Sequence, residues 1–256
     1  MQTLRRLRDR LTAWCADYLS RPLKGFEPPA AYSLDQLAAL LQPGDVLLVE
    51  GNLRISSVIK YITQSTWSHV AIYVGPQPGA RSDDPPVLVE AELAQGVILS
   101  PLSKYVNFHT RICRPIVLRP EDRERVVAHA LGRVGHGYDL KNVIDLARDR
   151  LSRTSVAATL KRGLRALGSG EPTRTICSTL IAQAFQSVRY PILPTRLLRP
   201  CRDVAPDRKD DCVEEAWESG HFSMFAPRDF DLSPYFAVVK PLPVIDFDYT
   251  QLRWAD

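Results

Sequence analysis

The chain has 256 residues, of which 45% are hydrophobic and 24% charged, and this is the composition of an ordinary globular protein. It excludes a disordered chain, a collagen and a protein with many membrane spans. The 33 basic and 29 acidic residues give a formal net charge of +4, which is too small to require a nucleic-acid partner. The 20 prolines predict many stiff loops and turns.

The cysteines are scattered along the chain and are never spaced as C-x-x-C, which argues against a disulfide framework and against a zinc ribbon. They are Cys15, Cys113, Cys177, Cys201 and Cys212. Arginines interrupt the N-terminal apolar stretch that a signal peptide would need, and no apolar run is long enough to cross a membrane. We therefore expect a cytoplasmic protein, with a leaderless export route left open.

The elements expected in the first half of the chain begin with one amphipathic helix over residues 1–22, where apolar side chains recur at spacings of three and four between arginines. This helix either packs on the domain or lies on an anionic lipid surface. The patterns that follow predict helices over 32–41 and 53–63, and strands over 46–49, 69–75, 87–91, 96–100 and 111–118. The middle of the chain is therefore expected to form an antiparallel sheet.

The second half of the chain predicts helices over 121–134, 141–151 and 175–188. Within 141–167, basic residues far outnumber acidic ones and alternate with apolar ones, which indicates either a solvated helical face or a membrane-facing insert. No aromatic residue lies within 139–167 to stack on bases, so we expect no nucleic-acid partner.

The sequence signatures of several enzyme classes are absent from the chain. It has no G-x-S-x-G elbow, no Walker phosphate loop, no dinucleotide-binding glycine pattern and no H-E-x-x-H metal helix. His129 and His136 are seven residues apart, but no cysteine or third histidine stands nearby to complete a metal site. We expect no metal and no cofactor.

Cys177 stands in the first turn of a predicted helix, after threonines placed where a helix cap is needed. The N–H groups at a helix start favour a thiolate over a thiol, and they also stabilise the oxyanion that forms when the thiolate attacks a carbonyl. A cysteine at such a position is also common in ordinary packing. The hypothesis that Cys177 is catalytic therefore requires a general base elsewhere in the chain.

His69 is the candidate base because it opens a predicted strand and follows polar residues. Glu90 interrupts the apolar run of the next strand, and Glu90 and Glu92 can both share a face with His69 because strand side chains alternate. Either carboxylate can fix the imidazole tautomer and stabilise the imidazolium. Together these residues supply a nucleophile, a base and an orienting group.

These residues resemble the permuted papain-like hydrolases of the YiiX type, which are relatives of the NlpC cell-wall hydrolases. The resemblance rests on six short motifs that occur in order over residues 44–230: Gly44-Asp45-Val46-Leu47, Ser68-His69-Val70-Ala71-Ile72-Tyr73-Val74-Gly75, Glu90-Ala91 with Gly96-Val97, Gly137-Tyr138-Asp139, Cys177-Ser178-Thr179-Leu180, and Pro227 with Asp229-Phe230. It implies a catalytic triad of Cys177, His69 and Glu90 in permuted order.

The same resemblance implies further residues near the cleft. Tyr138 and Asp139 match a motif placed beside it, and Ser68 and Ser178 flank the catalytic histidine and cysteine, so these four are candidate substrate-binding residues. Thr179 departs from the family pattern, in which an acidic residue is common. Residues 189–226 are expected to form a long exposed connection that lines or covers the cleft.

The predicted fold class is α+β: a permuted papain-like, NlpC-type domain over 31–240 with an antiparallel, barrel-like sheet packed on the helix that carries the cysteine. Residues 1–30 form an N-terminal helix and linker, 141–170 a basic helical insert, and 241–256 a C-terminal tail.

The expected activity is a thiol hydrolase that cleaves an amide bond, and the resemblance points first to peptides or wall-derived peptides. One alternative is a lipid acyl hydrolase or acyltransferase that uses the same triad at an anionic membrane. The other alternative is a non-catalytic binding module, for which Thr179 is the only indication. The expected partner is a small substrate with an amide or ester bond, and no oligomeric state is indicated.

Overall fold

A computed structural model describes residues 18, 21–23, 25, 32–78, 84–92, 95–138, 174–175, 177–200, 213–240 and 250. The predicted N-terminal helix within 1–17, the basic insert over 141–170, Asp139 and nearly all of the 241–256 tail lie outside these residues. No helix in the described ranges is long and apolar enough to cross a membrane.

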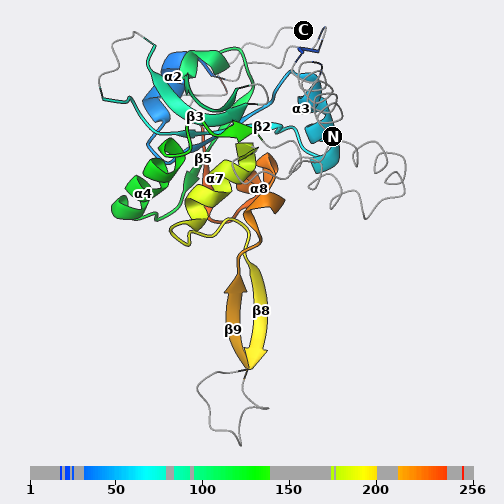
Figure 1. Ribbon diagram of the computed structural model, residues 1–256, viewed down its shortest axis with the longest axis vertical. Helices are drawn as coiled ribbons and strands as arrows, with labels where there is room; N and C mark the ends of the chain where they lie inside the picture. The colour runs from blue at the N-terminus through cyan, green and yellow to red at the C-terminus, as the bar shows by residue number, and fades with distance from the viewer. Residues whose placement is uncertain are drawn as a thin grey trace, which may run out of the picture.

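Six antiparallel strands form the central sheet, in the order β10-β5-β1-β2-β3-β4 (Figure 1). Their bounds are β1 Val46–Val49, β2 His69–Tyr73, β3 Pro86–Glu92, β4 Gly96–Pro101, β5 Thr110–Pro115 and β10 Phe236–Val239. The strands predicted over 46–49, 69–75, 87–91 and 96–100 are therefore confirmed, and so is the antiparallel pairing.

The predicted barrel-like closure of the sheet is wrong. The two edge strands, β10 and β4, do not pair with each other in the described part of the chain. The outer side of β4 instead meets the segment after α4 (Pro120–Leu131), because Val97 N donates to His136 O at 2.7 Å and Gly135 N donates to Val97 O at 2.8 Å. The sheet is thus open, with one edge occupied by a loop.

Helices cover both faces of the sheet, because its strands are apolar on both sides. All four residues of β1 are buried, and they alternate between two hydrophobic clusters. On one face lie α4, α7 (Cys177–Gln186) and α8 (Pro227–Leu232), which share the larger cluster around Phe185 and Phe230. The other face is covered by α2 (Leu34–Leu40) and the short 3-10 helix η1 (Leu102–Tyr105).

The predicted helices agree with α2, with α3 (Arg54–Thr63), with α4 and with α7, apart from a few residues at their ends. The strand predicted over 111–118 ends at Pro115 because Val117 has a left-handed backbone, with φ at 55°. α8 and β10 have no counterpart among the predicted elements. Both are short, and they are recognisable only by how they pack on the sheet.

A buried ion pair fixes the turn before β1. Gly44 has φ at 89°, a conformation that glycine adopts without strain, and Asp45 follows it with 1% exposure. Its carboxylate accepts from Gln42 N at 2.8 Å and pairs with Arg114 Nη2 of β5 at 2.7 Å. This contact joins the turn to the neighbouring strand.

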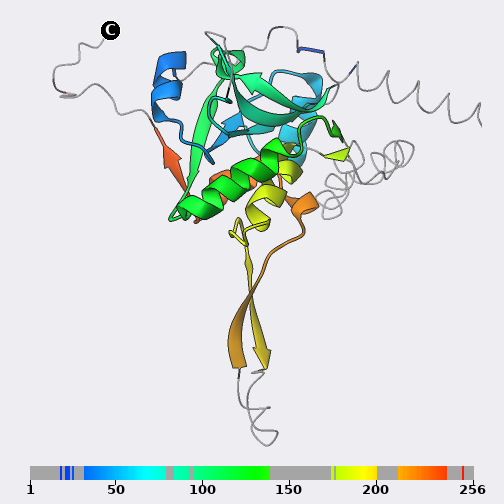
Figure 2. The ribbon, with the colours of Figure 1, turned by 60° about the vertical axis from the view of Figure 1, so that its left-hand side comes forward.

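Two further pairs of strands lie outside the central sheet. β6 (Gly137–Tyr138) and β7 (Arg174–Thr175) run parallel to each other just before α7. β8 (Thr195–Pro200) and β9 (Val213–Glu218) form an antiparallel ribbon that extends away from the sheet (Figures 1 and 2). Leu198 and Trp217 on this ribbon are 68% and 60% exposed.

Candidate active site

A cavity of about 330 Å³ lies where the first residues of β2 and α7 meet α3 and η1. Much of its wall is apolar and comes from Val49, Leu53, Ile55, Ile59 and Phe108. The spacing of Ile55 and Ile59 places both on one face of α3, which explains why this amphipathic helix borders the cavity. The polar part of the wall includes Cys177 and His69, the two residues expected to react.

Cys177 is the first residue of α7, and its thiol is free and 5% exposed. The helix begins there as predicted, while the preceding cap position lies outside the described residues. The first N–H groups of a helix have no carbonyl partner within the helix, so they can bind an anion that forms beside the helix start. This position gives the sulfur a neighbouring set of hydrogen-bond donors.

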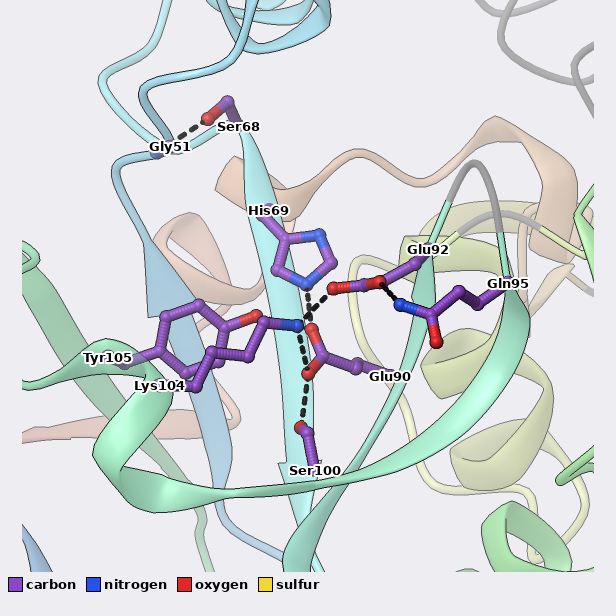
Figure 3. A network of polar contacts seen from close by, with 9 residues as sticks. All are labelled: Gly51, Ser68, His69, Glu90, Glu92, Gln95, Ser100, Lys104 and Tyr105. Atoms are coloured by element: carbon purple, nitrogen blue, oxygen red, sulfur yellow. Dashed lines mark hydrogen bonds and ion pairs between the residues drawn. The ribbon is translucent and has the colours of Figure 1, made fainter. Parts of the chain in front are cut away.

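His69 lies between Cys177 and Glu90. Its Nε2 is 2.6 Å from Oε2 of Glu90 (Figure 3), and His69 and Cys177 line the same cavity. Burial alone would lower the pKa of His69, but the hydrogen bonds and charges of Cys177 and Glu90 outweigh it and raise this pKa to about 10. The arrangement therefore favours the imidazolium form of His69 beside the Glu90 carboxylate.

Glu90 is fully buried on β3, with 0% exposure, and its carboxylate is saturated with donors. Oε2 accepts from His69 and from the Tyr105 hydroxyl, while Oε1 accepts from the Ser100 hydroxyl and, at 2.7 Å, from Lys104 Nζ (Figure 3). Burial would raise the pKa of this carboxyl, but His69 and Lys104 hold it well below its usual range. Glu90 is thus held as an anion inside the protein.

The geometry distinguishes the two carboxylates that the sequence left open. The register pairs Glu90 with Ala71, which lies two residues along β2 from His69 and on the same face of the sheet. The His69 ring therefore reaches the Glu90 carboxylate on the neighbouring strand. Glu92 contacts Lys104 and accepts from Gln95 Nε2 at 2.7 Å instead. Within the described residues, Glu90 is therefore the carboxylate in contact with His69.

The four candidate substrate-binding residues have different surroundings. Ser68 lines the cavity, but its hydroxyl accepts from Gly51 N at 2.9 Å and so holds the loop after β1. Ser178 is 1% exposed, and its hydroxyl has no hydrogen-bond partner among the residues that the structure describes. Tyr138 lies on β6, which pairs with the strand just before Cys177, and Asp139 is outside the described residues.

Sequence reasoning did not single out Ser100, Lys104 or Tyr105. Ser100 ends an apolar strand, and the other two belong to a single 3-10 turn, so no periodic pattern marks them. They become recognisable only in the folded chain, where η1 packs over β3 and brings Lys104 and Tyr105 to Glu90, while the neighbouring strand β4 brings Ser100.

The cavity takes no residue from the described part of 189–226. The expectation that this segment lines or covers the cleft is wrong for these residues, because β8 and β9 pair with each other and extend away from the sheet (Figure 2). Nor do the described ranges bring together three histidine, cysteine, aspartate or glutamate side chains that could hold a metal ion.

An open antiparallel sheet that carries a histidine and a glutamate on adjacent strands, with a later helix that begins at a cysteine, has the arrangement of a permuted papain-like protein. Residues 40–151 match the family model described as permuted papain-like amidase enzyme, YaeF/YiiX, C92 family. This match confirms the resemblance and supports a cysteine hydrolase-type activity. It includes His69 and Glu90 and ends before Cys177.

Among solved structures, the chain is similar to one described as metalloprotein yiiX from Escherichia coli O157:H7. The two sequences are 16% identical, the alignment covers 78% of this chain and 97% of that chain, and the TM-score is 0.47.

Proposed function

We propose that this protein is a thiol hydrolase that cleaves an amide bond through an acyl-enzyme on Cys177. The observation that carries the proposal is the position of His69, which is 2.6 Å from Glu90 and lines the same cavity as Cys177. Each residue then has one role. Cys177 is the nucleophile, His69 the acid and base, and Glu90 the group that orients His69 and stabilises its charged form.

In the first half of the reaction, the Cys177 thiolate attacks the carbonyl carbon of the amide and forms a carbon–sulfur bond. The carbonyl oxygen becomes an oxyanion, which the N–H groups at the start of α7 can stabilise. His69 then donates its proton to the amide nitrogen, the carbon–nitrogen bond breaks, and an amine leaves. The products of this half are a thioester on Cys177 and a neutral His69.

In the second half, neutral His69 removes a proton from water, and the resulting hydroxide attacks the thioester carbon. The carbon–sulfur bond breaks, a carboxylic acid leaves, and the thiolate and imidazolium are restored. Glu90 keeps its negative charge throughout, because four donors hold it.

The direct test is turnover of a panel of short peptides and wall-derived peptides by wild type and by Cys177→Ala. We expect the variant to be inactive and to unfold at the wild-type temperature. Cys113→Ala is the matched control, since it removes the other free thiol in the described residues, which is buried in β5. A Cys177→Ala protein that retained wild-type turnover would refute the proposal.

A lipid acyl hydrolase or acyltransferase with the same triad is the second candidate function. It is favoured by the apolar wall that Leu53, Ile59 and Phe108 form beside Cys177, since this wall suits an acyl chain. Release of fatty acid from anionic phospholipid vesicles tests it. In that case Ile59→Asn, which places an amide in the wall, should reduce lipid hydrolysis strongly and the hydrolysis of a short polar peptide little.

The remaining proposals concern where the protein acts. A cytoplasmic protein that associates with an anionic membrane through basic amphipathic segments agrees with the composition of 1–22 and 141–167. Flotation with anionic vesicles at low salt tests this, and vesicles that leave the protein behind would argue against it.

The last candidate function is a non-catalytic binding module of the same fold. If the protein is such a module, Cys177 should be alkylated no faster than an ordinary buried thiol.

A further inference from the structure

Lys104 is the charged residue among the donors to Glu90 that lies outside the candidate triad. It lies in η1, and its Nζ is 2.7 Å from Oε1 of Glu90. The same ammonium group contacts Oε1 of Glu92 and lies 5.2 Å from the centre of the Tyr105 ring. Its side chain is 30% exposed and forms part of the cavity wall, so the group stands between the cavity and the buried carboxylate.

The charges of the site explain why a cation is needed at this place. The proposed function requires a Cys177 thiolate, a His69 imidazolium and a Glu90 carboxylate, which together leave one negative charge in excess, and Glu90 is fully buried. A buried carboxylate without a counterion is costly, and it takes up a proton instead. Lys104 supplies the missing positive charge directly on Oε1, while His69 is bound to Oε2.

Other groups that face Glu90 cannot replace this charge. Ser100 from β4 and Tyr105 from η1 donate hydrogen bonds but are neutral, and burial together with Glu90 raises the pKa of Tyr105 further. Glu92 on β3 adds a negative charge, which is partly solvated because its side chain is 25% exposed. Among the described residues around Glu90, the positive charges are therefore those of His69 and Lys104.

We propose that Lys104 is a positioning residue for the reaction: its ammonium group keeps Glu90 ionised and oriented toward His69, and so sets the lower end of the pH range in which Cys177 is reactive. This inference rests on the proposed function and deepens it. Without the cation, the Glu90 carboxyl takes up a proton at higher pH, and a protonated Glu90 no longer stabilises the His69 imidazolium.

The experiment compares wild type, Lys104→Met and Lys104→Arg in the rate of Cys177 alkylation by iodoacetamide across pH, read by peptide mass spectrometry. In Lys104→Met the apolar stem is kept and the charge is lost, so a merely structural role would leave the pH profile in place. We expect its acid limb to move up by about one pH unit. Lys104→Arg keeps the charge and should restore most of the wild-type profile.

Glu92→Gln is the matched control, since it removes the other carboxylate on Lys104 and leaves the contact with Glu90. Its acid limb should stay in place or move down. A Lys104→Met profile that coincides with wild type would overturn the positioning role alone. A wild-type Cys177 that shows no reactivity below the pKa of a free thiol would refute the proposed function, and with it this inference. If Lys104→Met fails to fold, Lys104→Gln provides the same comparison.

Discussion

Replacing Glu90 by glutamine tests most sharply how the site works, because it changes one charge and almost no volume. The buried carboxylate accepts four hydrogen bonds, two on each oxygen. A glutamine side chain has one oxygen and one NH₂ group, and the NH₂ group cannot accept. In one orientation it faces the Lys104 ammonium, in the other it faces His69 Nε2, and either placement sets donor against donor.

The size of the effect follows from the contact between Glu90 and His69. A hydrogen bond to a charged group is worth about 1.5–3 kcal/mol, and a loss of about 2 kcal/mol lowers the population of the thiolate–imidazolium pair by about 30-fold. We therefore expect Cys177 in Glu90→Gln to be alkylated at pH 6 about 30-fold more slowly than in wild type.

The assay is the second-order rate constant for iodoacetamide labelling of Cys177, with thermal unfolding to show that the variant is folded at the assay temperature. Glu92→Gln is the matched control, because Glu92 lies two residues along the same strand and contacts Lys104 but not His69. We expect that control to stay within about threefold of wild type. A folded Glu90→Gln with the wild-type rate would show that the Glu90–His69 contact does not control the thiol.

Four further predictions follow from the buried groups. Cys177 should be alkylated at neutral pH, and its alkylation should be slower in His69→Ala. Cys113, whose pKa burial raises to about 12, should stay unlabelled, so equal labelling of the two cysteines would contradict this prediction. Because the folded pKa of His69 is raised from 6.5 to about 10, its contribution to stability is fully present below pH 6.5 and is lost as pH rises through about 10. Turnover should fall over that same rise, since the imidazolium acid is lost, while alkylation of Cys177 should not fall; turnover that stays level to pH 11 would exclude His69 as the acid. Asp45→Asn breaks the buried pair with Arg114 and should cost about 3 kcal/mol in urea unfolding, so a midpoint that does not move would contradict the assigned role of this pair.

The elements that carry the candidate triad could be predicted because each is local. β2 and β3 form a hairpin of apolar, β-branched runs, and the polar residues His69 and Glu90 stand out against those runs. The helix of Cys177 is apolar, and in the sequence it follows Gly168-Ser169-Gly170, which interrupts the preceding helical pattern. Residue type, alternation and order were sufficient to propose Cys177 and His69 and to limit the carboxylate to Glu90 or Glu92, which only the contact with His69 distinguishes.

What could not be predicted depends on contacts between distant segments. Lys104 and Tyr105 reach Glu90 only because a 3-10 turn packs back over the sheet, and a single turn has no periodicity to detect. The open edge of the sheet depends on whether β4 meets another strand or a loop, and strand patterns alone do not distinguish these cases. The β8–β9 ribbon was missed because its charged and exposed residues have the composition of a loop.

Because β6 pairs with β7, the geometry of the candidate site does not depend on how many residues lie between these two strands. Gly137 and Tyr138 pair with Arg174 and Thr175, so both ends of segment 139–173 are held together just before α7. The entropy of closing a loop grows only slowly with its length, so residues can be added to or removed from such a segment at small cost. His69 and Glu90 lie on a hairpin that precedes it. A change in the length of this segment therefore leaves the positions of the three candidate residues relative to one another unchanged.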